Sequence, residues 1–98
     1  MQTPVFRPEP KDGREGLTYV CGCPCVPTAA PAEDGAPGME HCCCGKVHVV
    51  GNGAEAVLSA YLAERKATRK REPDYERGTA EVALGGRPVE VAWAFPIE

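Results

Sequence analysis

Six cysteines occupy one short part of this 98-residue chain. They form two runs, Cys21-Gly-Cys23-Pro-Cys25 and His41-Cys42-Cys43-Cys44-Gly45. Thiolate sulfur is a strong ligand for Zn²⁺ and Cu(I), and imidazole nitrogen commonly accompanies it in zinc sites. The two runs therefore predict a thiolate metal site that ties together two segments of a small fold.

The candidate ligands are six thiolates and two imidazoles: Cys21, Cys23, Cys25, Cys42, Cys43, Cys44, His41 and His48. Side chains two residues apart in an extended chain point the same way. Cys23 and Cys25, with Cys42 and Cys44, are therefore our first choice for one tetrahedral zinc ion. Cys43 would point away from its neighbours, either toward a second ion or as a spare thiol. Eight donors would also serve two zinc ions.

Other chemistries remain as alternatives. Cu(I) would accept the same thiolates, whereas an iron–sulfur cluster is disfavoured because its common Cys-x-x-Cys spacing is missing. Disulfides are the main competitor, although the adjacent Cys42, Cys43 and Cys44 would pair with one another only under strain. His48 alternates with Lys46 and Val50 on one face of an expected strand, so a structural role for it competes with a ligand role.

The compartment decides between bound metal and disulfides. Residues 1–16 contain no apolar run of signal-peptide length, and no stretch approaches the roughly 20 apolar residues of a membrane-spanning helix. We therefore expect a cytoplasmic protein without a membrane partner. Its thiols would be reduced, and clustered cysteines there bind metal more often than they form disulfides.

One local resemblance accompanies the second cysteine run. The residues Cys42-Cys43-Cys44-Gly45-Lys46-Val47 resemble the first zinc-binding strand of glutathione-dependent formaldehyde-activating domains. Those domains take further cysteine ligands from downstream segments, and no cysteine follows Cys44 here. The resemblance implies a zinc-binding strand, and the family's activity is not carried over.

One amphipathic helix is predicted from Ala54 to about Glu72. Its apolar residues recur at the spacing that places them on one face: Val57, Leu58, Tyr61 and Leu62. Pro73 ends the helix because proline lacks an amide hydrogen and clashes with the preceding turn.

A β-hairpin is predicted at the C-terminus. Residues 79–84 and 87–95 flank Gly85-Gly86, a pair suited to the positive φ angles of a two-residue type I′ turn. Pairing residue 84 with 87 collects the large apolar side chains on one face: Val82, Val89, Val91, Trp93 and Phe95. We expect the helix to cover that face.

The expected fold class is therefore α+β. Residues 1–16 would form a flexible arm, and residues 17–98 one small domain that contains a Pro/Ala/Gly loop at 26–38. Two short strands, at residues 17–20 and 46–50, would join the hairpin against the helix. The cysteine-rich loops would form the metal-binding region.

The favoured function is that of a small soluble zinc-binding protein, in which the metal is structural or is itself held or sensed as cargo. A metal-scaffolded nucleic-acid or protein adaptor is the alternative, using the basic residues within 65–71 as its contact surface. Cations near a helix C-terminus also complement its dipole, so they do not require such a partner. A metal- or thiol-dependent enzyme is a further alternative, but no catalytic constellation is evident.

Overall fold

The computed structural model describes residues 4–19, 22, 24–68 and 74–97. The elements follow in the order β1 (Phe6–Lys11), β2 (Arg14–Tyr19), β3 (Thr28–Ala29), β4 (Gly38–His41), β5 (Val47–Val50), α1 (Ala54–Thr68), β6 (Asp74–Leu84) and β7 (Arg87–Ile97). They form a three-stranded sheet, β1-β2-β3, and a four-stranded sheet, β4-β5-β7-β6, both antiparallel. The expected α+β class is confirmed, with more strands than the sequence predicted.

The C-terminal hairpin has the predicted register. Leu84 pairs with Arg87, and Val82 pairs with Val89. Gly85 and Gly86 have φ angles of 61° and 79°, the positive values that a type I′ turn requires at both positions. The strands extend beyond the predicted limits, since β6 begins at Asp74 and β7 ends at Ile97.

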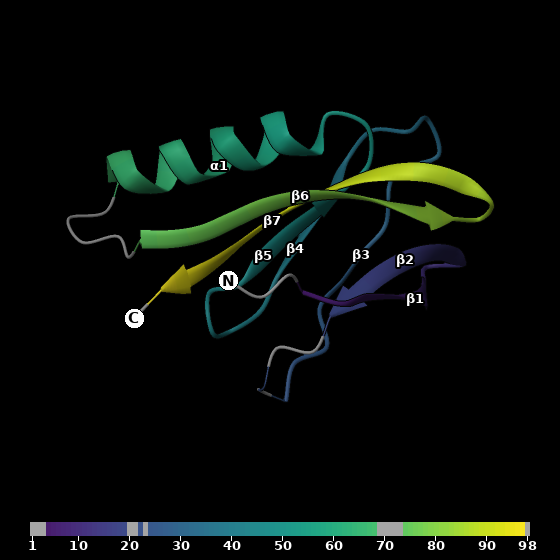
Figure 1. Cartoon of the computed structure of the whole chain (residues 1–98), viewed down its shortest axis with the longest axis horizontal. Helices are drawn as coiled ribbons and strands as arrows, with labels where there is room; N and C mark the ends of the chain where they lie inside the picture. The colour runs from purple at the N-terminus through teal and green to yellow at the C-terminus, as the bar shows by residue number, and fades with distance from the viewer. Residues whose placement is uncertain (1–3, 20–21, 23, 69–73, 98) are drawn as a thin grey trace.

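The predicted position of the helix is wrong. In Figure 1, α1 lies above the β6–β7 hairpin, while β1 and β2 lie below it. The helix packs Ala54 and Leu58 against the opposite face of the hairpin from Trp93, where Ala92 and Ala94 are small enough to let it approach closely. The sheet is thus covered on both faces at β5 and at the centre of β7, whereas Thr79 and Glu81 on the helix side of β6 stay exposed.

The large apolar face of the hairpin has a sheet as its partner. Val91 and Trp93 pack with Leu17 and Ala29 of the three-stranded sheet. Trp93 also lies against Gly78 of β6, where a Cβ atom would come within 2.2 Å of the indole Cζ2. A broad sheet covers this row of bulky side chains more completely than a single helix could, which explains the misplaced helix.

The expected arm, residues 1–16, is largely strand instead. β1 and β2 form a hairpin around Asp12 and Gly13, which have φ angles of 51° and 78°. The sequence signal was the Asp-Gly pair, which is typical of type I′ hairpins. Prolines in β1 obscured it, but an edge strand tolerates proline because it needs no amide donor on its outer side.

The other predicted elements are found close to their expected places. The strand expected at residues 17–20 is the end of β2, and the strand expected at 46–50 is β5. The loop expected at 26–38 contains the short β3 and leads into β4. The helix begins at Ala54 as predicted, and its expected last residues lie outside the described part of the chain.

Within the described residues, no helix combines the length and apolar character needed to cross a membrane.

Candidate metal centre

The second cysteine run forms the turn between β4 and β5. The Cys42 amide donates to the Lys46 carbonyl at 3.0 Å, and the Gly45 amide donates to the Cys42 carbonyl at 3.1 Å. Gly45 has a φ of 91°, the left-handed conformation that commonly closes a three-residue hairpin loop. Three consecutive cysteines thereby lie in one tight turn, and Gly45 serves that turn rather than redirecting the chain toward His48.

Among the described residues, the cysteines of this turn take part in two close sulfur–sulfur contacts. Cys42 Sγ and Cys44 Sγ lie 2.7 Å apart, as expected for side chains that point the same way. Cys43 points elsewhere and meets Cys25, with 3.4 Å between the two sulfur atoms. Both separations exceed the roughly 2.05 Å of a disulfide bond. Two thiolates on one tetrahedral zinc would lie about 3.8 Å apart, given Zn–S bonds of about 2.3 Å.

The segment that carries Cys25 is anchored to β2. Thr18 Oγ1 donates to the Pro27 carbonyl at 2.8 Å, and this hydrogen bond is buried. The neighbouring Thr28 begins β3, which pairs with β2. These contacts fix the segment on β2, and Cys25 lies beside the β4–β5 turn of the other sheet, although 18 positions separate it from Cys43.

The described residues do not by themselves complete a metal site. Cys21 and Cys23, two of the predicted ligands, lie outside the described residues. Among the rest, no group of three or more His, Cys, Asp or Glu side chains converges where it could hold a metal ion. A single tetrahedral ion would require the two sulfur pairs to approach each other, or Cys21 and Cys23 together to complete one of them.

The cysteines differ in their surroundings. Cys42 is only 5% exposed and packs with Tyr19, Phe6 and Phe95. Cys25, Cys43 and Cys44 are exposed to solvent. This aromatic support was not predicted from the sequence, because Phe6 lay in the expected arm. The Asp-Gly turn that returns β1 along β2 was the signal that could have revealed it.

The structure places His48 in the protein core. Its side chain is fully buried, and Nε2 lies 2.9 Å from the Leu17 carbonyl oxygen. In the neutral tautomer that carries its proton on Nε2, the ring donates a hydrogen bond to this oxygen. The Tyr19 ring packs edge-on against the imidazole at a centroid distance of 4.7 Å. Burial lowers the pKa of His48 from 6.5 to about 4, although the Leu17 hydrogen bond and Glu40 act in the opposite direction. These contacts match the structural role that the sequence left open for it.

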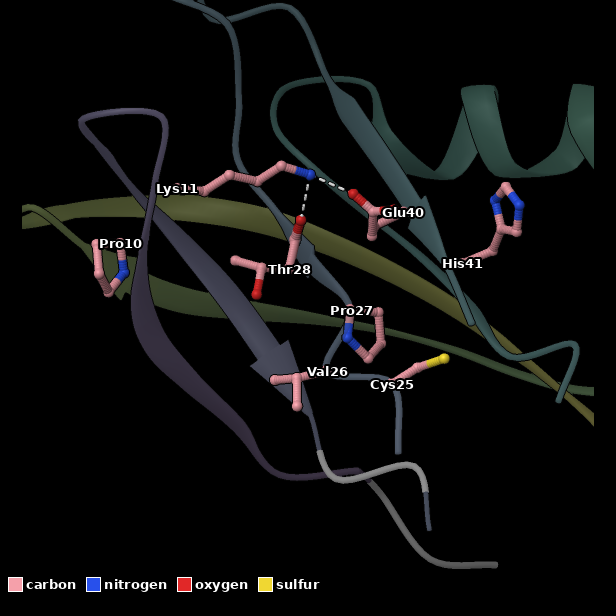
Figure 2. Close-up of a pocket in the computed structure, with 8 residues that line it drawn as sticks. All are labelled: Pro10, Lys11, Cys25, Val26, Pro27, Thr28, Glu40 and His41. Carbon is pink, nitrogen blue, oxygen red and sulfur yellow. Dashed lines mark hydrogen bonds and ion pairs between the residues drawn. The ribbon is translucent and has the colours of Figure 1, made fainter. Parts of the chain in front are cut away.

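His41 lies at the protein surface, near the Cys25–Cys43 sulfur pair. It lines a pocket of about 390 Å³ together with Cys25, as Figure 2 shows. Lys11 crosses this pocket to form an ion pair with Glu40 and donates to the Thr28 carbonyl. Neither Lys11 nor Glu40 was singled out from the sequence, because the pair forms only when β1 and β4 meet.

Comparison of the chain with protein-family models, with curated proteins and with solved structures found no significant match.

Proposed function

We propose that this chain is a small zinc-binding protein whose thiolates join the segment 21–25 to the turn 42–44. The observation that carries the proposal is the 3.4 Å approach of Cys25 Sγ to Cys43 Sγ, from two segments far apart in sequence. A second thiol pair, Cys42 and Cys44, lies in the same turn. Four thiolates are the usual donor set of a structural zinc site.

Two roles of the metal fit this location. A structural ion would tie the cysteine-bearing segments together, since Cys25 and Cys43 come from separate segments and both are exposed. An ion held or sensed as cargo would equally suit an exposed site, because solvent access permits exchange. A chelator separates the two roles: removing a structural ion disorders the cysteine-bearing segments, whereas removing cargo leaves them folded and lowers the unfolding temperature only by the binding free energy of the ion.

The adaptor alternative gains no support from the described part of the basic stretch. Arg65 lies over the Tyr61 ring, 5.3 Å from its centroid, and donates to the Tyr61 hydroxyl. Arg69, Lys70 and Arg71 lie outside the described residues.

The enzyme alternative has one observation in its favour, namely the pocket that adjoins Cys25 and His41. An open coordination position facing that pocket would allow metal chemistry. Cobalt substitution tests it: a visible spectrum that changes on adding a small anion such as azide indicates an open position, and an unchanged spectrum indicates a closed site.

The proposal is tested by elemental analysis of protein purified with reductant and without chelator. The matched variants are Cys25→Ser/Cys43→Ser and Cys42→Ser/Cys44→Ser, each removing one sulfur pair, with Val26→Ser as the control at an exposed neighbour. We expect zinc in the parent and the control. Complete loss in either pair variant indicates one shared ion, and loss of half indicates two.

The helix signal in circular dichroism checks that each variant folds. The helix α1 packs in a core cluster on the opposite face of the sheet from Trp93, and that cluster contains none of the substituted cysteines. A folded parent chain without zinc contradicts the proposal. Pair variants that keep the full zinc content also contradict it.

A further inference from the structure

We propose that Cys25 and Cys43 form a reversible disulfide when a hydroperoxide reaches this edge of the molecule. The Cys25–Cys43 pair is then an oxidation site as well as a pair of metal ligands. Its consequence for zinc rests on the proposed function, whereas the disulfide itself does not.

The geometry selects this pair. The two sulfur atoms are 3.4 Å apart, so bond formation requires them to approach by about 1.4 Å. Both side chains are exposed, so a small oxidant and a reductant can reach them. The anchoring of Pro27 by Thr18 holds Cys25 in place beside the turn.

The second pair is less suited to the same reaction, although its sulfur atoms are closer. Cys42 and Cys44 are two residues apart within a hydrogen-bonded turn, so their disulfide would close a very small ring. Such a ring distorts the backbone, and strained disulfides are readily reduced. Cys42 is also covered by aromatic side chains. Of the two sulfur pairs in the described part of the chain, oxidation should therefore favour Cys25 and Cys43, which link the two segments.

The chemistry needs one hydroperoxide per disulfide. The first thiolate attacks the outer peroxide oxygen, the O–O bond breaks, and the released oxygen anion takes a proton to become water or an alcohol. This leaves a sulfenic acid. The second thiolate then attacks the sulfenic sulfur, an S–S bond forms, and the S–O bond breaks to release hydroxide, which is protonated to water. Two thiols are oxidised by two electrons, and the peroxide is reduced by two electrons.

Oxidation would also change the metal site. Zinc binds thiolate sulfur, and a disulfide sulfur carries no thiolate charge. Formation of the Cys25–Cys43 bond removes two candidate ligands at once and leaves Cys42 and Cys44 as the described thiols. The zinc ion should then be released, and a thiol reductant should restore its binding.

Peptide mapping tests the disulfide directly. The full-length protein is treated with hydrogen peroxide, its remaining thiols are alkylated, and it is cleaved after glutamate. Cleavage at Glu33 and Glu40 separates Cys25 from Cys43, so their disulfide appears as two linked peptides that reductant separates. The variant Cys43→Ser should lose this linkage and accumulate a sulfenic acid at Cys25, trapped by dimedone. The neighbouring variant Cys44→Ser is the matched control and should keep the linkage.

The outcomes separate this inference from the proposed function. Fragment spectra that join Cys25 to Cys43, with zinc release followed by a chromogenic chelator, support both. The same linkage in a protein that never contained zinc supports the oxidation site and contradicts the zinc proposal. Zinc-loaded protein that forms no such linkage, or that links Cys42 to Cys44 instead, overturns the oxidation site and leaves the zinc proposal standing.

Discussion

The centre of the four-stranded sheet differs from the cysteine edge of the molecule in the side chains that stabilise it. The cysteine edge comprises Cys25 and the turn 42–46. In the centre, Val49, Ala92 and Ala94 are completely buried under α1. At the edge, Cys43 and Cys44 are exposed, and two backbone hydrogen bonds shape the turn. The centre is stabilised by apolar burial that needs no metal. At this edge Cys42 packs with aromatic side chains, whereas Cys25, Cys43 and Cys44 are exposed, and we expect sulfur chemistry to add a cross-link there.

The first way to test this contrast is to damage the centre. Leu58 is 1% exposed and fills the helix side of the core, so Leu58→Ala should destabilise the protein by about 2–5 kcal/mol. Urea unfolding measures this loss, and Glu64→Ala, an exposed change on the same helix, should cost less than about 0.5 kcal/mol. The folded Leu58→Ala protein should keep its zinc. Loss of zinc from it would show that centre and edge are not independent.

The second test uses the pH dependence of His48. In the unfolded chain it titrates near 6.5, whereas burial lowers its pKa in the fold to about 4. Above pH 6.5 His48 is neutral in both the folded and the unfolded protein, so its titration does not reduce the free energy of unfolding. As pH falls from 6.5 to 4, the unfolded chain binds a proton that the folded protein does not, so stability decreases by up to roughly 3 kcal/mol. Below pH 4 this contribution stops changing.

The matched variant for that test is His48→Gln, whose amide can still donate to the Leu17 carbonyl. Urea unfolding at pH 7 and pH 4.5, with chelator present for both proteins, should show a smaller loss of stability in the variant. An equal loss would contradict the assigned burial. Zinc lost from the variant at pH 7 would place His48 among the ligands and break the contrast.

The third test concerns the Trp93 side of the sheet. A methyl group at Gly78 would meet the indole ring, so Gly78→Ala should cost about 1–3 kcal/mol through overpacking. Thermal unfolding, with Trp93 fluorescence as a local probe, measures the effect. The neighbouring Thr79→Ala is the control because Thr79 is exposed. A Gly78→Ala protein as stable as its parent would mean that the indole moves without cost.

The smallest expected effect is at the end of the helix. Arg65→Ala removes a contact with Tyr61 at a partly exposed position and should cost less than about 1 kcal/mol. Lys66→Ala, at the exposed neighbour, controls for the loss of one charge. A large decrease in nucleic-acid affinity for Arg65→Ala in a filter-binding assay would instead favour the adaptor alternative.

The sequence predicted those parts of the fold that depend on local pattern. Alternation and the Gly-Gly turn fixed the β6–β7 register, and helical spacing located the start of α1. The side on which α1 packs could not be predicted in this way, because the centre of β7 is buried on both faces and the partner of Trp93 came from an N-terminal hairpin that the prolines concealed.

The candidate metal centre also combines features that local spacing predicts with features that depend on tertiary packing. Cys42 and Cys44 lie together and Cys43 points away from them, as predicted, but the cause is a tight turn and not the extended run that the spacing argument assumed. Spacing did not reveal that Cys43 meets Cys25, since that depends on how β3 and β4 approach each other. His48 lay at the right distance along the chain for a ligand, and strand direction alone could not distinguish a ligand from the core residue that the structure contains.

The most direct test of the account is X-ray absorption at the zinc K-edge of the freshly purified, reduced protein. We expect a first shell of about four scatterers dominated by sulfur at about 2.3 Å. In Cys25→Ser/Cys43→Ser the sulfur contribution should decrease or zinc should be lost. A first shell made of nitrogen and oxygen at about 2.0–2.1 Å, or a folded protein without zinc, would contradict the claim that these two segments share a metal ion.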